Sequence, residues 1–202
     1  MLFSAPMVRA LLSGRKTQTR RVVKGEALRW LDDAGFTPGF TADPDNNLCP
    51  YGKPGGRLWV KETWRPTASL QPWDLDVRYN ADGAVRTIKD GEFGDRDWTM
   101  PKAAATGNVS PLFMPRWASR LTLEITDVRI EQLHACSEAD AEAEGVENPS
   151  LVPILGAFWS SRDGYAKLWE HINGAGSWAT NPWVWVVTFA ARQASNPTAE
   201  GV

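Results

Sequence analysis

The sequence predicts an α+β protein built on a small β-barrel or strongly curved mixed sheet, with short flanking helices and long loop insertions. Three observations indicate this class: the strand patterns are short or bent, few segments have helical periodicity, and connections rich in Gly and Pro separate them. The 202 residues are 43% hydrophobic and 23% charged, which is enough for one buried core. We therefore expect a single domain over 1–192 and a flexible tail over 193–202.

Three segments predict helices. The N-terminal segment predicts a helix that begins after Ser4. The segment "SEADAEAEGV" begins with Ser137 and Asp140 in capping-box spacing and predicts a short acidic helix that ends at Gly145. The segment "YAKLWEHING" predicts an amphipathic helix that ends at Gly174, because its apolar residues follow the spacing i, i+3, i+4, i+7. These apolar residues are Tyr165, Leu168, Trp169 and Ile172.

Three other segments predict strands. In "RLTLEITDVRI", apolar and polar residues alternate up to Ile125, and the apolar phase then moves to Val128 and Ile130. This shift predicts a bulge or bend near Asp127. The segment "RLWVKETW" predicts a further strand, and "PWVWVVTF", apolar on both faces, predicts a central strand. Residues 35–56 are dense in turn-forming residues and predict a loop.

Composition and residue spacing limit the possible partners. The net charge of -2 gives no overall attraction to a polyanion, so any contact with nucleic acid must be local. Cys49 and Cys136 belong to no Cys/His cluster, and His134 and His171 have no ligand spacing, so we expect neither a metal nor a cofactor. The use of only two cysteines favours a reducing cytoplasm. The apolar N-terminal run is too short and too interrupted to cross a bilayer, so we expect a soluble protein without a membrane partner.

The segment "GRKTQTRR", residues 14–21, is the most unusual in the chain. Taken alone, it is typical of a solvated turn whose cations complement the end of the preceding helix. It also offers a hydroxyl nucleophile, Thr19, with Lys16 three residues earlier as a base. A free lysine has a pKa of about 10.4, so burial and neighbouring cations would have to lower the pKa of Lys16, whereas a nearby carboxylate would oppose that change.

The order of the segments resembles the ASCH domain of the PUA-like superfold. The resemblance runs from Leu2 to Phe189 and rests on the first helix, "GRKTQTRR", "GGRLWVKETW", the 121–130 strand, "SEADAEAEGV" and "WVWVVTF". Short bacterial members are amidohydrolases of N4-acetylcytidine that carry G-[RK]-K-T-x-T-x-R and a later A-E-x-E, and this chain has both. Insertions at 26–50 and 66–114 have no counterpart, and we expect them to line or cover the pocket.

The resemblance implies a catalytic set of Lys16, Thr19 and Glu144. Glu142 and Glu144 are two residues apart on a helix, so only one of them can point inward. For Glu144 two roles stay open: it holds the lysine in place, or it exchanges a proton with the substrate. The expected pocket stacks the base on an aromatic ring and holds it with a carboxylate and a guanidinium. The expected substrate-binding residues are Phe3, Arg21, Glu62 and Tyr79.

The implied activity is hydrolysis of the N4-acyl amide of acylated cytosine nucleosides, to cytidine and a carboxylic acid, with Thr19 as nucleophile and Lys16 as base. The alternative is an RNA-binding PUA-like module or a ribonuclease, in which Arg116 and Arg120 extend the basic patch of "GRKTQTRR". RNA binding draws on a stripe of basic charge. The acidic balance of the chain therefore favours the enzyme, with a small nucleoside as its partner.

Overall fold

The computed structural model describes residues 1–33, 35–71, 73–93, 99–146 and 160–193. The chain divides into two compact units: unit 1 contains 1–12, 58–123 and the C-terminal segment from 191, and unit 2 contains 13–57 and 124–190. Helices and antiparallel strand pairs occur together, so the predicted α+β class is confirmed. The single domain that we expect over 1–192 stays a prediction.

The helices are α1 Ala5–Leu12, α2 Glu26–Asp32, α3 Pro38–Ala42, α4 Glu138–Ala143 and α5 Ser161–Asn173. The strands are β1 Gln18–Val22, β2 Arg57–Trp59, β3 Trp64–Ala68, β4 Leu75–Tyr79, β5 Val85–Ile88, β6 Leu121–Gln132 and β7 Trp183–Gln193. They form a four-stranded sheet in the order β1-β7-β6-β2 and a three-stranded sheet in the order β3-β4-β5. Among the described strands, neither sheet closes into a barrel.

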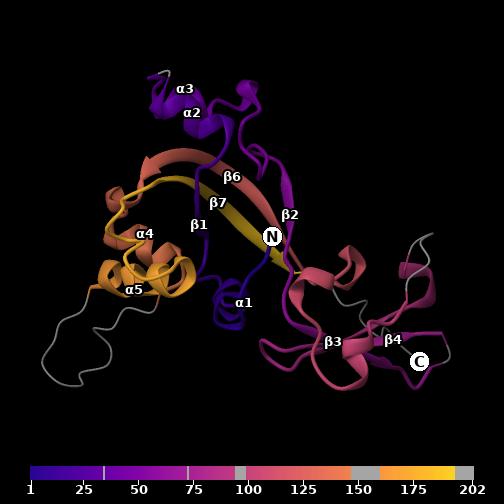
Figure 1. Cartoon of the computed structure of the whole chain (residues 1–202). Coiled ribbons are helices and arrows are strands. Elements are labelled where there is room, and N and C mark those ends of the chain that lie inside the picture. Colours follow the sequence, from indigo (N-terminus) through magenta and orange to yellow (C-terminus); the bar gives the residue numbers. More distant parts are fainter. Residues whose placement is uncertain (34, 72, 94–98, 147–159, 194–202) are drawn as a thin grey trace, which may run out of the picture. The chain divides into compact units, whose positions relative to one another are not determined.

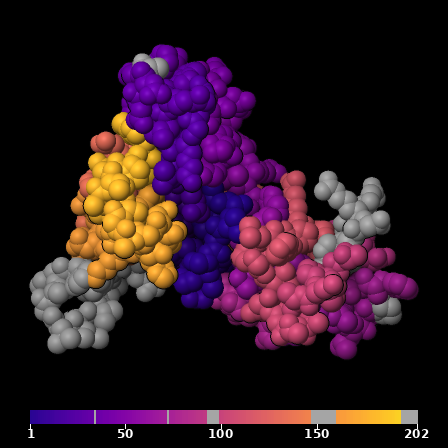
Figure 2. Space-filling model, in the orientation of Figure 1, coloured from indigo at the N-terminus to yellow at the C-terminus, as the bar shows by residue number. Residues whose placement is uncertain are grey.

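The sheet of unit 2 is dominated by two long curved strands, β6 and β7 (Figure 1). The predicted central strand is confirmed, because β7 lies between β1 and β6. β1 pairs antiparallel with β7, with Gln18 opposite Thr188 and Arg21 opposite Trp185. In the space-filling view, the indigo segment that contains β1 adjoins the yellow C-terminal segment (Figure 2).

The two faces of this sheet carry different hydrophobic clusters. Val184 and Val186 pack with Tyr165 and Trp169 of α5, whereas Trp185 belongs to a second cluster. The second cluster contains Val23, Ala27, Leu31, Ile130 and Trp185, with α2 among its contributors. Since successive side chains of a strand point to opposite faces, α4 and α5 cover one face, and α2 and α3 lie on the other (Figure 1).

The long strand β6 changes its buried phase part-way along. Leu123 and Ile125 are buried, Thr126 and Asp127 are both exposed, and the next buried residue is Ile130. Two successive exposed residues break the period-2 pattern. The phase shift that the sequence predicts near Asp127 is therefore confirmed.

Unit 1 contains the three-stranded sheet and its own core. The core residues are Trp64, Leu75, Val77, Tyr79, Ile88, Ala104, Val109, Met114 and Ala118. The segment 66–114, for which the sequence predicts at most short strands or helical turns, supplies most of this core and holds β4, β5 and short 3-10 turns. The insertion is therefore a folded part of unit 1.

Three sequence predictions need correction. Residues 35–56 are not all loop, because Pro38 begins α3 and the Thr37 hydroxyl accepts a hydrogen bond from Phe40 N. The strand predicted over "RLWVKETW" is interrupted between β2 and β3. Ile172, predicted on the buried side of α5, is 56% exposed. Much of the tail over 193–202 lies outside the described residues.

The capping box predicted for the acidic helix is confirmed. The Ser137 side chain accepts from Asp140 N, and the Asp140 carboxylate accepts from Ser137 N. No described helix combines the length and the apolar character that crossing a bilayer requires.

Candidate functional site

The edge strand β1 presents its even-numbered backbone groups away from β7. Phe189 N donates to Thr17 O and Val23 N donates to Trp183 O, both at 2.9 Å, so the odd-numbered residues make the bonds to β7. The carbonyl of Gln18 therefore points to the open edge. Lys16 Nζ donates to this carbonyl at 2.9 Å, which places the ammonium at the edge of the strand.

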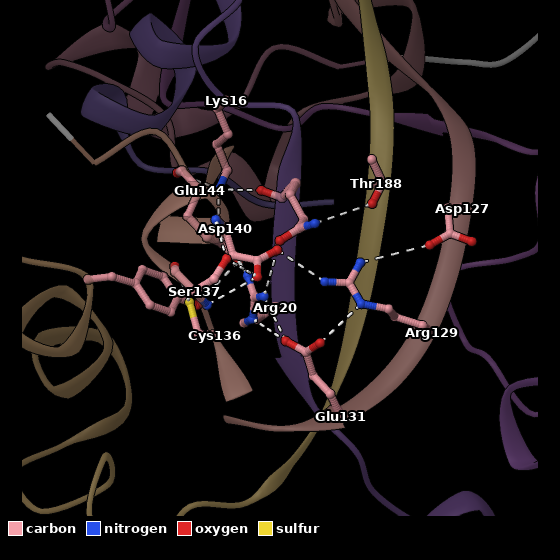
Figure 3. A network of polar contacts seen from close by, with 12 residues as sticks. Lys16, Arg20, Asp127, Arg129, Glu131, Cys136, Ser137, Asp140, Glu144 and Thr188 are labelled. Carbon is pink, nitrogen blue, oxygen red and sulfur yellow. Dashed lines mark hydrogen bonds and ion pairs between the residues drawn. The ribbon is translucent and has the colours of Figure 1, made fainter. Parts of the chain in front are cut away.

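The Lys16 ammonium meets Glu144 at the end of α4. Its Nζ atom donates to Glu144 Oε2 at 2.7 Å and to the backbone oxygen of Glu144 at 2.8 Å (Figure 3). Lys16 is 2% exposed and Glu144 is 3% exposed. Glu144 is the C-cap of α4, whose capping box fixes where the helix begins, so the local sequence of α4 places the carboxylate.

Burial lowers the pKa of Lys16 from its ordinary value, and the negative charge and hydrogen bond of Glu144 oppose that change. The positive charges of Arg21 and Arg20 lower the pKa further. The direction of this pKa shift matters chemically. A lysine whose pKa is lowered has a larger neutral fraction near pH 7, and only the neutral form can accept a proton.

Arg20 is the centre of a buried network on the same side of the sheet. Its Nη2 atom lies 2.7 Å from Glu131 Oε1 and 3.2 Å from Asp140 Oδ1, and its Nη1 atom lies 3.5 Å from Glu144 Oε1. Nη1 also donates to Gln18 Oε1 at 2.6 Å. The guanidinium therefore ties β1 to both α4 and β6.

Two further side chains complete this network. Arg129 donates to Glu131 Oε2 at 3.0 Å and to Asp140 Oδ1 at 3.1 Å. The Tyr165 hydroxyl donates to Glu144 Oε1 at 3.3 Å, so both oxygens of that carboxylate have donors. We name the side chains of this network the β1–α4 network: Lys16, Gln18, Arg20, Arg129, Glu131, Asp140, Glu144 and Tyr165.

Thr19 lies on the other face of the sheet. It stands opposite Val187 in the register, between Gln18 and Arg20, whose side chains both enter the β1–α4 network. Alternation along the strand therefore turns the Thr19 side chain away from that network, to the face that carries Trp185. The structure brings Lys16 and Glu144 together and places Thr19 across the edge strand from them.

The expectation that only one of the two helix carboxylates points inward is confirmed. Glu144 is buried and binds Lys16, whereas Glu142 is exposed and accepts a hydrogen bond from Ser161 Oγ at 3.2 Å. Arg21, half-buried, follows Thr19 by two residues and lies on the same face as Thr19. These two expected site residues therefore share one face.

The other three expected site residues lie in unit 1. Both oxygens of Glu62 accept hydrogen bonds from the Arg120 guanidinium at 2.9 Å. That guanidinium lies 4.1 Å from the centroid of the Tyr79 ring, and the Tyr79 hydroxyl donates to Ala118 O. Phe3 is buried. Substrate contacts of Phe3, Glu62 and Tyr79 stay predictions.

Sequence reasoning missed the role of Arg20 and its partners. It treated Arg20 as one of several cations near Lys16, because "GRKTQTRR" was compared with a solvated turn. The overlooked signal is alternation: once residues 18–22 form a strand, Gln18 and Arg20 share one face and Thr19 and Arg21 share the other. The partner Glu131 lies on β6 and could not be paired with β1 without the sheet order.

In the part of the chain that the structure describes, no three His, Cys, Asp or Glu side chains are grouped so as to hold a metal ion. Comparison of the chain with protein-family models, with curated proteins and with solved structures found no match.

Proposed function

We propose that this protein is an amidohydrolase that cleaves the N4-acyl amide of acylated cytosine nucleosides such as N4-acetylcytidine. The observation that carries the proposal is the buried contact between Lys16 and Glu144, which are 128 residues apart. They are two of the three positions at which this chain resembles the catalytic set of the ASCH amidohydrolases. Their contact supports the view that the matched motifs form one site.

In the proposed mechanism, Lys16 is the general base. A general base acts in its neutral form, and the lowered pKa of Lys16 favours that form. The ammonium lies at the edge of β1 that no other strand occupies, and it contacts the end of α4 there. Lys16 and Thr19 are each 2% exposed, so the proposed reaction requires a local opening at this edge before a substrate reaches them.

Thr19 is the proposed nucleophile. Neutral Lys16 takes the hydroxyl proton while Thr19 Oγ1 attacks the acyl carbonyl, which forms a tetrahedral intermediate. The C–N bond then breaks, and the N4 nitrogen leaves with a proton returned by Lys16. Water hydrolyses the resulting threonyl ester, so that the products are the cytosine nucleoside and a carboxylic acid.

Glu144 is proposed to position the lysine. One carboxylate oxygen accepts from Lys16 and the other from Tyr165, so the carboxylate is fixed at both ends. Its charge also stabilises the ammonium that forms when Lys16 takes the proton. We further propose that the fold belongs to the PUA-like superfold, for which the curved four-stranded sheet with its flanking helices is supporting evidence.

The alternative, an RNA-binding module, is less well supported by the same contacts. Of the cations proposed for a basic patch, Lys16, Arg20 and Arg120 are at most 4% exposed, and all three are paired with carboxylates. Only Arg15, Arg21 and Arg116 keep appreciable exposure. A phosphate backbone is bound by accessible cations, so burial of the others weakens this alternative.

The test is a multiple-turnover assay with N4-acetylcytidine, in which cytidine is measured by chromatography. We expect product in large excess over protein, strong loss of activity in Glu144→Gln, and near-normal activity in the matched control Glu142→Gln. No turnover, together with RNA binding that weakens steeply with salt, would replace the enzyme by the RNA-binding module.

A further inference from the structure

Unit 2 contains a cavity of about 380 Å³ that belongs to none of the contacts described above. It is a partly open cavity lined by the end of α3, the following loop, the first residue of β2 and one residue of β6. The residues that line it are Ala42, Asp43, Pro44, Asn47, Leu48, Cys49, Tyr51, Gly52, Lys53, Pro54, Gly56, Arg57 and Val128. Its volume is within the range of small-ligand sites, about 300–1,000 Å³.

The cavity lies on the same face of the sheet as Thr19. Its lining residues Tyr51 and Val128 pack in the cluster that contains Trp185, and Trp185 stands opposite Arg21 in the register. Burial raises the pKa of Tyr51, and the Arg21 guanidinium is close enough to oppose that change. Thr19 and Arg21 therefore lie on the face of the sheet that also carries the cavity, although neither residue lines it.

A tight turn holds two cations at the wall of this cavity. Gly56 N donates to Lys53 O at 2.8 Å, and a Cβ atom at position 56 would lie 2.8 Å from that same oxygen. Glycine at 56 thus allows the close turn that separates Lys53 from Arg57. Gly55 N donates to Ile125 O, so the turn is also fixed to β6.

The charge of the lining is positive. Within the described residues, neither Lys53 nor Arg57 forms an ion pair. Asp43 is the one carboxylate of the lining, and its Oδ1 atom already accepts a hydrogen bond from Asp45 N. Two cations against one carboxylate in the lining favour an anionic ligand.

We propose that this cavity binds the phosphate of a phosphorylated N4-acylcytosine nucleoside, so that the substrate is a nucleoside monophosphate. This inference rests on the proposed function, since Thr19 identifies the face on which the substrate lies. Lys53 and Arg57 hold the phosphate, Tyr51 covers the sugar, and the base extends along Arg21 toward Thr19. The cavity therefore sets the choice between nucleotide and nucleoside.

The binding test does not depend on catalysis. Calorimetric titration compares cytidine 5′-monophosphate, cytidine and inorganic phosphate, using the full chain, the double variant Lys53→Gln/Arg57→Gln and the control Lys167→Gln. Lys167 is exposed on α5, which packs on the opposite face. We expect the monophosphate to bind at least roughly tenfold more tightly than cytidine, and only the double variant to lose this advantage.

Equal affinity for the monophosphate and for cytidine would overturn the proposal. So would an equal loss of monophosphate affinity in the double variant and in Lys167→Gln. A third contrary result is much tighter binding of oligocytidylate that the double variant abolishes. The last result would assign the cavity to a nucleic-acid strand. An unchanged thermal midpoint in the double variant shows that it is folded, because both residues are exposed.

A kinetic comparison separates this inference from the proposed function. The ratio of kcat/KM for N4-acetylcytidine 5′-monophosphate to that for N4-acetylcytidine should exceed one and fall toward one in the double variant. Hydrolysis of both substrates at equal kcat/KM contradicts the cavity assignment and leaves the amidohydrolase intact. Tight monophosphate binding without any hydrolysis contradicts the amidohydrolase and leaves the phosphate site intact.

Discussion

Lys16 Nζ lies 2.7 Å from Glu144 Oε2 at the open edge of β1, and both side chains are almost completely removed from solvent. Breaking such a pair by removing one partner is costly, about 3–5 kcal/mol, because the remaining charge stays buried. A buried lysine has the alternative of losing its proton, and that alternative is the chemistry proposed for Lys16.

Replacement of Lys16 by arginine keeps the positive charge and removes the base. Arginine does not deprotonate in proteins, so Lys16→Arg should lower turnover of N4-acetylcytidine at least a few hundredfold, as should Lys16→Ala. Steady-state assays of both variants check this. If Lys16→Arg keeps near-normal turnover, Lys16 acts through its charge and is not the base.

The two carboxylates of the acidic helix provide a matched pair. Glu144→Gln removes the charge that faces Lys16 and should lower turnover by roughly a hundredfold or more. Glu142→Gln changes an exposed side chain and should have little effect. Assays of both variants at one pH check this, and the reverse pattern would show that Glu142 is the functional carboxylate.

Two substitutions test Thr19: one removes its hydroxyl group, and the other replaces the residue by one that also has a hydroxyl group. Thr19→Ala should lose at least a few hundredfold in turnover, whereas Thr19→Ser should keep measurable activity because it retains a nucleophilic oxygen. The double variant with Lys16→Ala should lose little more than either single variant, since the two residues act as one unit. Near-normal activity of Thr19→Ala would indicate a water molecule as the nucleophile.

The β1–α4 network should also stabilise the fold. Arg20→Met leaves the buried carboxylate of Glu144 and the half-buried carboxylates of Glu131 and Asp140 without this cation, and should lower the free energy of unfolding by about 3–5 kcal/mol. Arg15→Met, at an exposed position, should change it by less than about 0.5 kcal/mol. Urea unfolding measures both. Equal effects would mean that the network adds nothing to stability.

Asp140 should make the fold sensitive to acid. Burial raises the pKa of the Asp140 carboxyl, but hydrogen bonds from Ser137 and the positive charge of Arg20 lower it by more. The pKa of Asp140 therefore lies well below its ordinary value. The folded state therefore binds this proton less readily than the unfolded state, so the stabilisation is present above the ordinary pKa and is lost as pH falls toward the lowered value. Asp140→Asn should flatten the dependence of unfolding free energy on pH below about 4.

The elements that the sequence predicts best are those set by local chemistry. Ser137 and Asp140 identify the start of α4, and the alternation of β6 with its shift near Asp127 is present in the structure. Helical rotation of about 200° between Glu142 and Glu144 implies that only one of them points inward. The choice of Glu144 comes from the resemblance to the ASCH amidohydrolases. Capping and periodicity need no knowledge of distant segments.

The parts that could not be predicted depend on pairing between distant segments. The carboxylate partners of Arg20 include Glu131 on β6 and Asp140 on α4, and nothing near Arg20 in the sequence identifies Glu131. The cavity forms where the 42–57 loop meets Val128, which likewise requires the fold. Thr19 points to the face opposite to that of Gln18 and Arg20. This follows from the alternation of side chains along a strand, but only once residues 18–22 are assigned to a strand.

The pH dependence of kcat for N4-acetylcytidine tests most directly the claim that Lys16 is a base held by Glu144. Activity should rise with pH with a midpoint below 10.5, the ordinary pKa of lysine, since burial lowers the pKa of Lys16. Glu144 raises that pKa, so Glu144→Gln should move the midpoint to lower pH, whereas Glu142→Gln should leave it in place. A midpoint that is unchanged in Glu144→Gln, or that persists in Lys16→Arg, would contradict the account.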